Sequence, residues 1–231
     1  MGSPTRHLDF QLQRSDGSTS PYRFEAEHLV IAGWAARDQA AVRHHVDELA
    51  ALGVPRPSTT PLFYRAATAL LTQAPTIEVL GPDSSGEAEP LLLTTLEGPL
   101  VGLASDHTDR AAETWSVAHS KQICAKPVAP ILWRFAEVEP HWDSLILRAW
   151  IPDGDGGWVP YQEGPVSSLR RPDELAALAG DLPARTAMLC GTLGTIGGVR
   201  PAVGFRMELQ DPTLGRSITH AYAVEPLPIV T

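Results

Sequence analysis

The sequence of 231 residues predicts a mostly β fold with a few helices, an α+β class built on a folded sheet or a barrel-like roll. Many short segments read as strands separated by Gly, Pro and Asp, and only a few stretches have the apolar spacing of a helix. No internal repeat or low-complexity tract divides the chain. We therefore expect one domain over residues 1–231, a length that can bury a single core.

The predicted elements follow the chain in order. Residues 8–14 and 22–31 alternate apolar and polar, as edge strands do, with a turn at Asp16-Gly17-Ser18. A helix is predicted over 37–52, ended by Gly53 and Pro55, and a shorter one over 66–72. The remaining prediction is a helix over 172–179 and strands over 76–80, 87–93, 99–104, 144–151, 186–191, 203–209 and 217–225.

Composition excludes several classes of function. The 18 Lys and Arg against 27 Asp and Glu give a net charge of −9, without a basic stripe, so we expect no nucleic-acid partner. No apolar run of 18 residues is present, so no membrane span is predicted. The first residues lack an apolar signal core, and Cys124 and Cys190 are too few for a disulfide framework. These observations favour a cytoplasmic protein with a small-molecule partner.

Two carboxylates open the predicted strand 87–93. Glu87 and Glu89 are spaced i and i+2, which places both side chains on one face of a strand. Adjacent carboxylates repel each other unless a proton or a cation lies between them. A solvated strand face is the alternative interpretation of this pattern.

A second acidic cluster follows the next predicted strand. Asp106 comes just after the apolar segment 99–104, and Asp109 and Arg110 follow it. Strand ends are common positions for ligands, and carboxylate oxygens suit Mg²⁺ first, with Mn²⁺ or Ca²⁺ as alternatives. A loop with an Asp cap and a local Asp–Arg pair is the other interpretation. His107 is interpreted as a loop residue behind the site and not as a ligand.

The predicted helix 37–52 carries a pair of acid and base residues. At 100° per residue, His45 falls inside the apolar stripe and Glu48 on its flank, whereas His44 and Asp47 face away. A carboxylate at this spacing can orient an imidazole as a general base. A surface ion pair beside one core histidine is the alternative.

Taken in this order, the motifs resemble the fumarylacetoacetate hydrolase superfamily from about Gly33 to the C-terminus. The matching segments are His45-Val-Asp-Glu48, Pro61-Leu-Phe63-Tyr-Arg65, Glu87-Ala88-Glu89, Ser105-Asp106-His-Thr108-Asp-Arg110, Lys121 with Pro127-Val-Ala-Pro130, and Gly191-Thr192-Leu193. Three positions depart from the usual pattern: Arg65 stands where Lys is usual, Glu113 where Gln is usual, and Leu193 where Pro is usual.

The resemblance implies a fumarylacetoacetase-like catalytic fold over residues 31–231, preceded by a β extension over 1–30. It also implies a homodimer. In the site it implies that Glu87, Glu89 and Asp106 hold the metal and that His45 and Glu48 activate water. Lys121 would donate to developing negative charge, with Lys126 as the competing assignment. The implied contacts to the substrate come from Arg65, Glu113 and Thr192.

The implied activity is metal-dependent hydrolysis of a carbon–carbon bond in a 1,3-dicarbonyl or acylpyruvate-like 2-oxo acid, a small-molecule carboxylate. Two alternatives stay open. One is a decarboxylase, isomerase or lyase that uses the same metal site on a related 2-oxo acid. The other is a non-catalytic small-molecule binding protein on the same scaffold.

Overall fold

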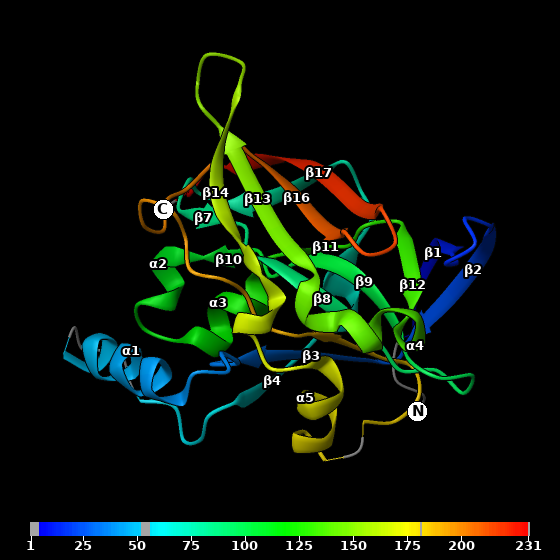
Figure 1. The fold of residues 1–231 in the computed structure, drawn as a ribbon. Helices are drawn as coiled ribbons and strands as arrows, with labels where there is room; N and C mark the ends of the chain where they lie inside the picture. Colours follow the sequence, from blue (N-terminus) through cyan, green and yellow to red (C-terminus); the bar gives the residue numbers. More distant parts are fainter. Residues whose placement is uncertain (1–4, 52–55, 181, 231) are drawn as a thin grey trace.

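The computed structural model describes residues 5–51, 56–180 and 182–230, which form mainly strands (Figure 1). The larger sheet has eight strands. Their order is β2 (Thr19–Ala26), β1 (Arg6–Gln13), β12 (Ile131–Arg134), β9 (Leu100–Ser105), β8 (Ala88–Leu93), β15 (Thr186–Leu189), β3 (His28–Gly33) and β4 (Leu62–Ala66).

A second sheet of five strands packs against the larger one. Its order is β14 (Trp158–Pro165), β13 (Ile146–Pro152), β16 (Gly204–Asp211), β17 (Arg216–Leu227) and β6 (Thr76–Leu80). Two short pairs complete the strands: β7 (Ser84–Ser85) with β10 (Thr108–Asp109), and β5 (Leu71–Thr72) with β11 (Lys126–Pro127).

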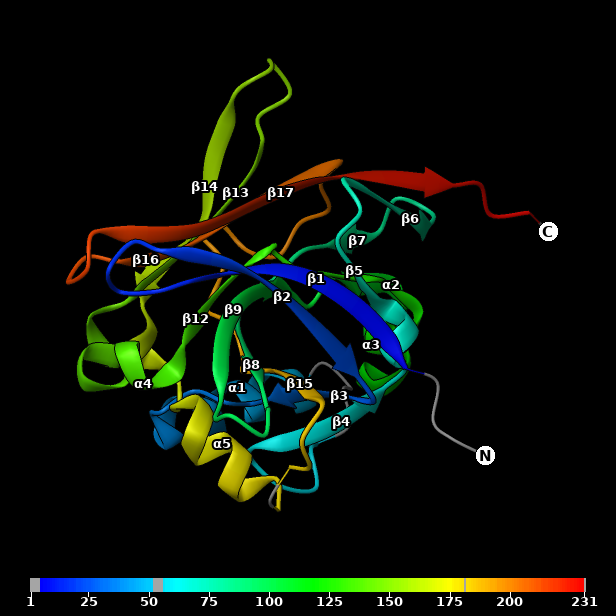
Figure 2. The same cartoon turned by 90° about the vertical axis from the view of Figure 1, so that its right-hand side faces the viewer.

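The larger sheet curls around one of its own faces. Phe10 of β1 and Phe24 of β2 share a buried apolar cluster with Ile31 of β3 and Leu91 of β8, although β2 and β3 lie near opposite ends of the strand order. Figure 2 shows β1 and β2 arching over one side of β8 and β9, with β3 and β4 on the other. The predicted folded or barrel-like sheet, and with it the α+β fold class, is confirmed.

The other face of the larger sheet packs on the five-stranded sheet. Leu92 of β8 and Val101 of β9 meet Phe205 and Met207 of β16 in the second buried cluster. Every residue of β8 and β9 is buried because both faces are covered. That double burial explains the unbroken apolar run Leu91-Leu92-Leu93, which an edge strand would not show.

Helices are few and short. They are α1 (Gln39–Ala51), α2 (Arg110–Glu113), α3 (Val117–Ile123), α4 (Phe135–Val138) and α5 (Pro172–Leu178), with 3₁₀ turns at Thr68–Leu70, Glu139–Ser144 and Val166–Ser168. Within the described ranges, none of the helices is long and apolar enough to span a membrane.

Most of the predicted elements occur within a few residues of their expected bounds, and two are wrong. The strand predicted over 22–31 is two strands, β2 and β3, which are separated at Glu27 and pair with different neighbours. Residues 66–72 contain a single 3₁₀ turn, not a helix, because Leu71 is fully buried and pairs with Lys126 in a parallel bridge. Gly53 and Pro55, predicted to end the first helix, lie outside the described residues. The predicted β extension at residues 1–30 contributes β1 and β2, and β1 joins the larger sheet by pairing parallel with β12.

Candidate metal centre

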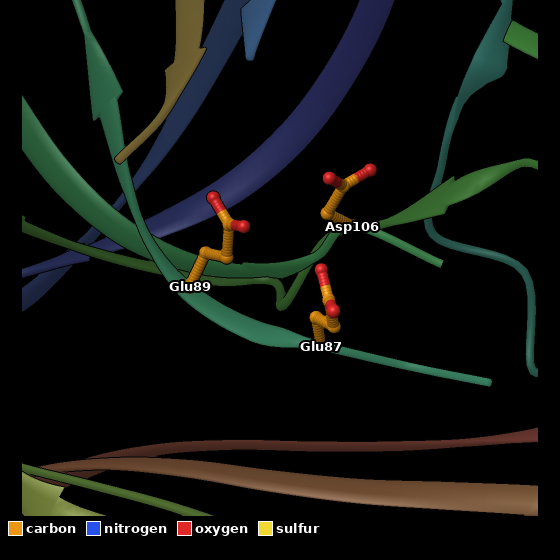
Figure 3. Close-up of side chains that lie close together, drawn as sticks. All are labelled: Glu87, Glu89 and Asp106. Carbon is orange, nitrogen blue, oxygen red and sulfur yellow. The ribbon is translucent and has the colours of Figure 1, made fainter. Parts of the chain in front are cut away.

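Three carboxylates meet at one edge of the larger sheet. β8 and β9 are antiparallel, with Ala88 opposite Ser105, so the start of β8 and the end of β9 lie side by side. Asp106 N–H donates to the Glu87 carbonyl at 2.9 Å and extends this ladder by one bond. As a result, one oxygen from each of Glu87, Glu89 and Asp106 lies within 4.8 Å of the others (Figure 3).

Glu89 is almost fully buried, at 2% exposed. Its Oε2 accepts a hydrogen bond from Gly191 N at 2.7 Å. Burial raises the pKa of Glu89 well above its usual range, and repulsion from Asp106 raises this pKa further. A positive charge at this position would therefore stabilise the ionised form of Glu89.

Asp106 faces two buried lysines. Lys121, in the last turn of α3, forms an ion pair with Oδ2, and Lys126 Nζ lies 2.9 Å from Oδ1 while donating to the His107 carbonyl at 2.5 Å. Burial alone would raise the pKa of Asp106, but Lys121 and then Lys126 outweigh it and hold the pKa at about 2. The structure therefore places both candidate lysines against the same carboxylate.

Asp106 Oδ1 is an exception to the rule that buried polar atoms are hydrogen-bonded. Its contact with Lys126 is close, but the angles do not make a hydrogen bond, and no other described residue supplies one. This oxygen keeps a lone pair for a cation. With three carboxylates and no His or Cys among them, the donor set fits a hard divalent ion such as Mg²⁺, Mn²⁺ or Ca²⁺.

Arg110 binds the cluster through Glu87 and links it to Glu113 and Ser85. Its guanidinium donates to Glu87 at 2.9 Å, to Glu113 at 2.8 Å and to Ser85 Oγ at 2.8 Å. Helix α2 begins at Arg110 because Asp109 caps it, accepting from Ala112 N at 2.8 Å. Figure 1 shows α2 and α3 beside β10, so two short capped helices bring Arg110 and Lys121 to the strand ends.

A buried polar chain lies behind Asp106. His107 Nδ1 is 2.9 Å from the Tyr222 hydroxyl, and His107 Nε2 is 2.9 Å from Ser84 Oγ. The same hydroxyl lies 2.8 Å from Ser105 Oγ, which accepts from Glu87 N at 3.2 Å. His107 is thus a loop residue behind the carboxylates, as the sequence predicted.

We expect His107 to make the protein less stable in mild acid. Burial, and next to it the charge of Lys126, lower the pKa of His107 from its ordinary 6.5 to about 3. The unfolded chain binds this proton near pH 6.5 and the folded protein only near pH 3. The free energy of unfolding is therefore not reduced by this proton above pH 6.5, and it falls as the pH decreases from 6.5 to 3. Relative to His107→Gln, the wild type should lose about 1.4 kcal/mol per pH unit there in urea unfolding. Parallel pH profiles for the two proteins would contradict this.

Two of the predicted substrate contacts lie beside the carboxylates. Glu113 is held there through Arg110. The Thr192 hydroxyl donates to the carbonyl of Ala88, the residue between Glu87 and Glu89, at 2.8 Å.

The structure does not bring Arg65 to the cluster. Its exposed guanidinium lies 3.0 Å from His28 Nδ1. Alternation along β4 instead turns Tyr64 toward the site, with its ring centroid 5.8 Å from Lys121 Nζ. Gly33 leaves space for this ring, because a Cβ there would come within 2.8 Å of it. Sequence reasoning did not single out Tyr64.

The predicted general-base pair is His45 and Glu48, on the first helix. Helix α1 carries positions 45 and 48, but the side chains of His45 and Glu48 lie outside the described residues. The assignment of these two residues to water activation stays a prediction.

Solved structures with the same fold include proteins of the fumarylacetoacetate hydrolase group. A fumarylacetoacetate isomerase/hydrolase candidate from Oleispira antarctica has a TM-score of 0.64 at 17% identity, covering 92% of this chain and 98% of that one. A yeast fumarylacetoacetate hydrolase family protein, ynq8, has a TM-score of 0.62 at 15% identity, covering 89% and 95%. A 2-keto-3-deoxy-D-arabinonate dehydratase complexed with magnesium and 2,5-dioxopentanoate has a TM-score of 0.58 at 13% identity, covering 90% and 77%.

These likenesses confirm the fold that the sequence motifs implied. No curated protein matches the chain. The model of a family described as protein of unknown function, DUF2848, matches residues 32–222, which includes all three carboxylates, both lysines and Arg110. The chain belongs to the DUF2848 family and has the fold of the fumarylacetoacetate hydrolase proteins.

Proposed function

We propose that the protein is a metal-dependent enzyme that hydrolyses a carbon–carbon bond in a 1,3-dicarbonyl or acylpyruvate-like 2-oxo acid. The observation that carries the proposal is the buried cluster of Glu87, Glu89 and Asp106 at the ends of two adjacent strands. Among the described residues it is the one group of three acidic, His or Cys side chains close enough to hold an ion. A divalent metal bound there would supply a Lewis acid for a carbonyl or carboxylate oxygen.

Lys121 is suited to stabilise negative charge on a substrate. Burial would lower its pKa, but Asp106, Glu87 and Glu89 together outweigh burial and raise this pKa, so the ammonium keeps its proton throughout the physiological range. Its side chain is 9% exposed, whereas Lys126 has none of its side chain exposed. Lys121 is therefore the lysine that can donate to a substrate oxygen, and Lys126 serves to hold Asp106 and the His107 carbonyl.

The remaining chemistry is assigned to the residues that surround the carboxylates. Tyr64, half-buried beside Lys121, is proposed to cover the site on the β4 side. Thr192 is the proposed contact for the substrate carboxylate, which would compete with the Ala88 carbonyl for its hydroxyl. His45 and Glu48 are proposed to activate the water that attacks the distal carbonyl.

A second reaction is also compatible with this site. The dehydratase that shares the fold was solved with magnesium and 2,5-dioxopentanoate. Dehydration, decarboxylation and isomerisation of a 2-oxo acid all need the same polarisation of a carbonyl oxygen and the same cationic support from Lys121. The fold and the carboxylates therefore support a lyase or isomerase of a related 2-oxo acid as the alternative.

Metal removal tests the proposal. The full-length protein, treated with chelator, should lose activity toward a panel of acylpyruvates and other 2-oxo acids. Return of Mg²⁺ or Mn²⁺ should restore it, because the substrate oxygen is polarised only with the ion present. Product analysis separates hydrolysis from dehydration, decarboxylation and isomerisation. Full activity in protein shown by elemental analysis to be metal-free would overturn the metal-dependent function.

A further inference from the structure

Gln162 of β14 is a buried amide that none of the site assignments uses. It has no exposed surface, and its hydrogen bonds reach two segments far away in the sequence. The Oε1 atom accepts from Ala88 N at 2.9 Å. The Nε2 atom donates to Thr192 Oγ1 at 2.7 Å and to the Leu193 carbonyl at 2.6 Å.

These contacts close a ring around one peptide. Ala88 lies between Glu87 and Glu89, and its N–H donates to Gln162 while its carbonyl accepts from Thr192 at 2.8 Å. Gln162 in turn donates to the Thr192 hydroxyl, so each of the three residues is bonded to the other two. The backbone between the two carboxylates is therefore fixed by side chains and not only by its neighbouring strand.

The strand pairing explains why such a ring is needed. β8 pairs with β15 only over Leu91–Leu93, and one further backbone bond joins Cys190 N to the Pro90 carbonyl at 3.0 Å. Beyond that point the chain after β15 leaves the ladder at Gly191, whose φ is +89°. On this side no strand of the described residues pairs with Ala88, and the side chains of Gln162 and Thr192 bond to its N–H and carbonyl instead.

We propose that Gln162 is a positioning residue that sets the spacing of Glu87 and Glu89 and docks the segment Gly191–Thr192 onto them. The same docking presents Gly191 N–H to Glu89 Oε2. The inference deepens the proposed function, since it assumes that these carboxylates hold a divalent ion. The hydrogen bonds of Gln162 go to Ala88, Thr192 and Leu193 and not to the carboxylate oxygens, so it acts through Ala88 and Thr192.

The test measures the binding of Mn²⁺ alone to chelator-treated full-length protein, by electron paramagnetic resonance. Gln162→Met removes all three hydrogen bonds at similar volume, and Thr192→Val removes the hydroxyl at similar shape. Each should weaken Mn²⁺ affinity about 10- to 100-fold, the usual effect of losing a residue that orients metal ligands. Thr192→Ser keeps the hydroxyl and should rescue most of the affinity. In the double variant of Gln162→Met and Thr192→Val, the fold-loss of Mn²⁺ affinity should be smaller than the product of the two single fold-losses. Both side chains bond to the Ala88 peptide, so their effects are not independent.

A second measurement does not depend on metal. Hydrogen exchange of residues 84–89 in the metal-free protein should accelerate in Gln162→Met. It should not accelerate in Leu209→Ala, which removes a buried side chain from the same five-stranded sheet. Unchanged exchange in Gln162→Met, or Mn²⁺ affinity equal to that of the wild type, would overturn the positioning role. Failure of the wild type itself to bind Mn²⁺, with exchange accelerated in Gln162→Met, would support the positioning role and overturn the proposed metal-dependent function alone.

Discussion

Replacing Glu89 with Gln should abolish metal binding and activity while making the metal-free protein more stable. Gln has nearly the same shape and can still accept from Gly191 N through its amide oxygen. It removes the charge whose burial, together with repulsion from Asp106, raises the pKa of this side chain. A carboxyl group whose pKa is higher in the folded protein than in the unfolded chain lowers the free energy of unfolding once the pH rises above its pKa in the unfolded chain. At neutral pH the gain should therefore be about 1 kcal/mol or more.

Bound metal should reverse the order of stability of the wild type and Glu89→Gln. Loss of a residue that orients a metal ligand typically lowers metal affinity about 10- to 100-fold. Loss of the ligand itself should therefore lower the affinity more than about 100-fold. An ion that binds only the folded protein stabilises the wild type in proportion to the logarithm of its concentration. Melting curves with and without Mg²⁺ should show Glu89→Gln above the wild type without the ion and below it with the ion.

Glu97→Gln is the matched control for this prediction. It removes the same charge from an exposed position four residues beyond the end of β8. It should leave Mg²⁺ affinity, activity and the effect of metal on melting unchanged. A Glu89→Gln protein that behaves like Glu97→Gln would refute the assignment of Glu89 as a metal ligand.

The carboxylates could be predicted because their arrangement follows from local rules. Alternation in a strand puts Glu87 and Glu89 on one face, whatever the rest of the chain does. Asp106 follows the next predicted strand. When a short turn joins two successive strands, the end of the second strand lies beside the start of the first. Glu89 shares its face of β8 with Leu91 and Leu93, which lie buried inside the curl of the larger sheet.

The rest of the site depends on contacts between distant segments, and no local pattern encodes them. Gln162 lies 74 residues from Ala88, and Tyr222 lies 115 residues from His107, so nothing near either residue in sequence indicates its partner. Helix α2 was not predicted because its 4 residues are too few to establish an apolar period. Helix α3 was not predicted either. Tyr64 and Arg65 show a one-residue ambiguity, since a motif match does not fix which neighbour on a strand faces the site.

The prediction with the largest effect on stability is Asp106→Asn. Asp106 has no exposed surface and is the shared carboxylate of two buried ammonium groups, on Lys121 and Lys126. Removing its charge leaves both lysines without this partner, and breaking a buried ion pair from one side costs about 3–5 kcal/mol. Urea unfolding should show a loss of this size, and Mg²⁺ should restore none of it, because the same substitution removes a metal ligand.

Asp109→Asn separates this effect from a general loss of carboxylates in the segment. Asp109 is also buried, but its role is to cap α2, and Asn caps a helix about as well as Asp, so we expect a change of less than about 0.5 kcal/mol. Adding Lys126→Met to Asp106→Asn should recover part of the lost stability, because one of the two buried charges is then gone. If the double variant is less stable than Asp106→Asn alone, Lys126 stabilises the fold through the His107 carbonyl and not through its charge on Asp106.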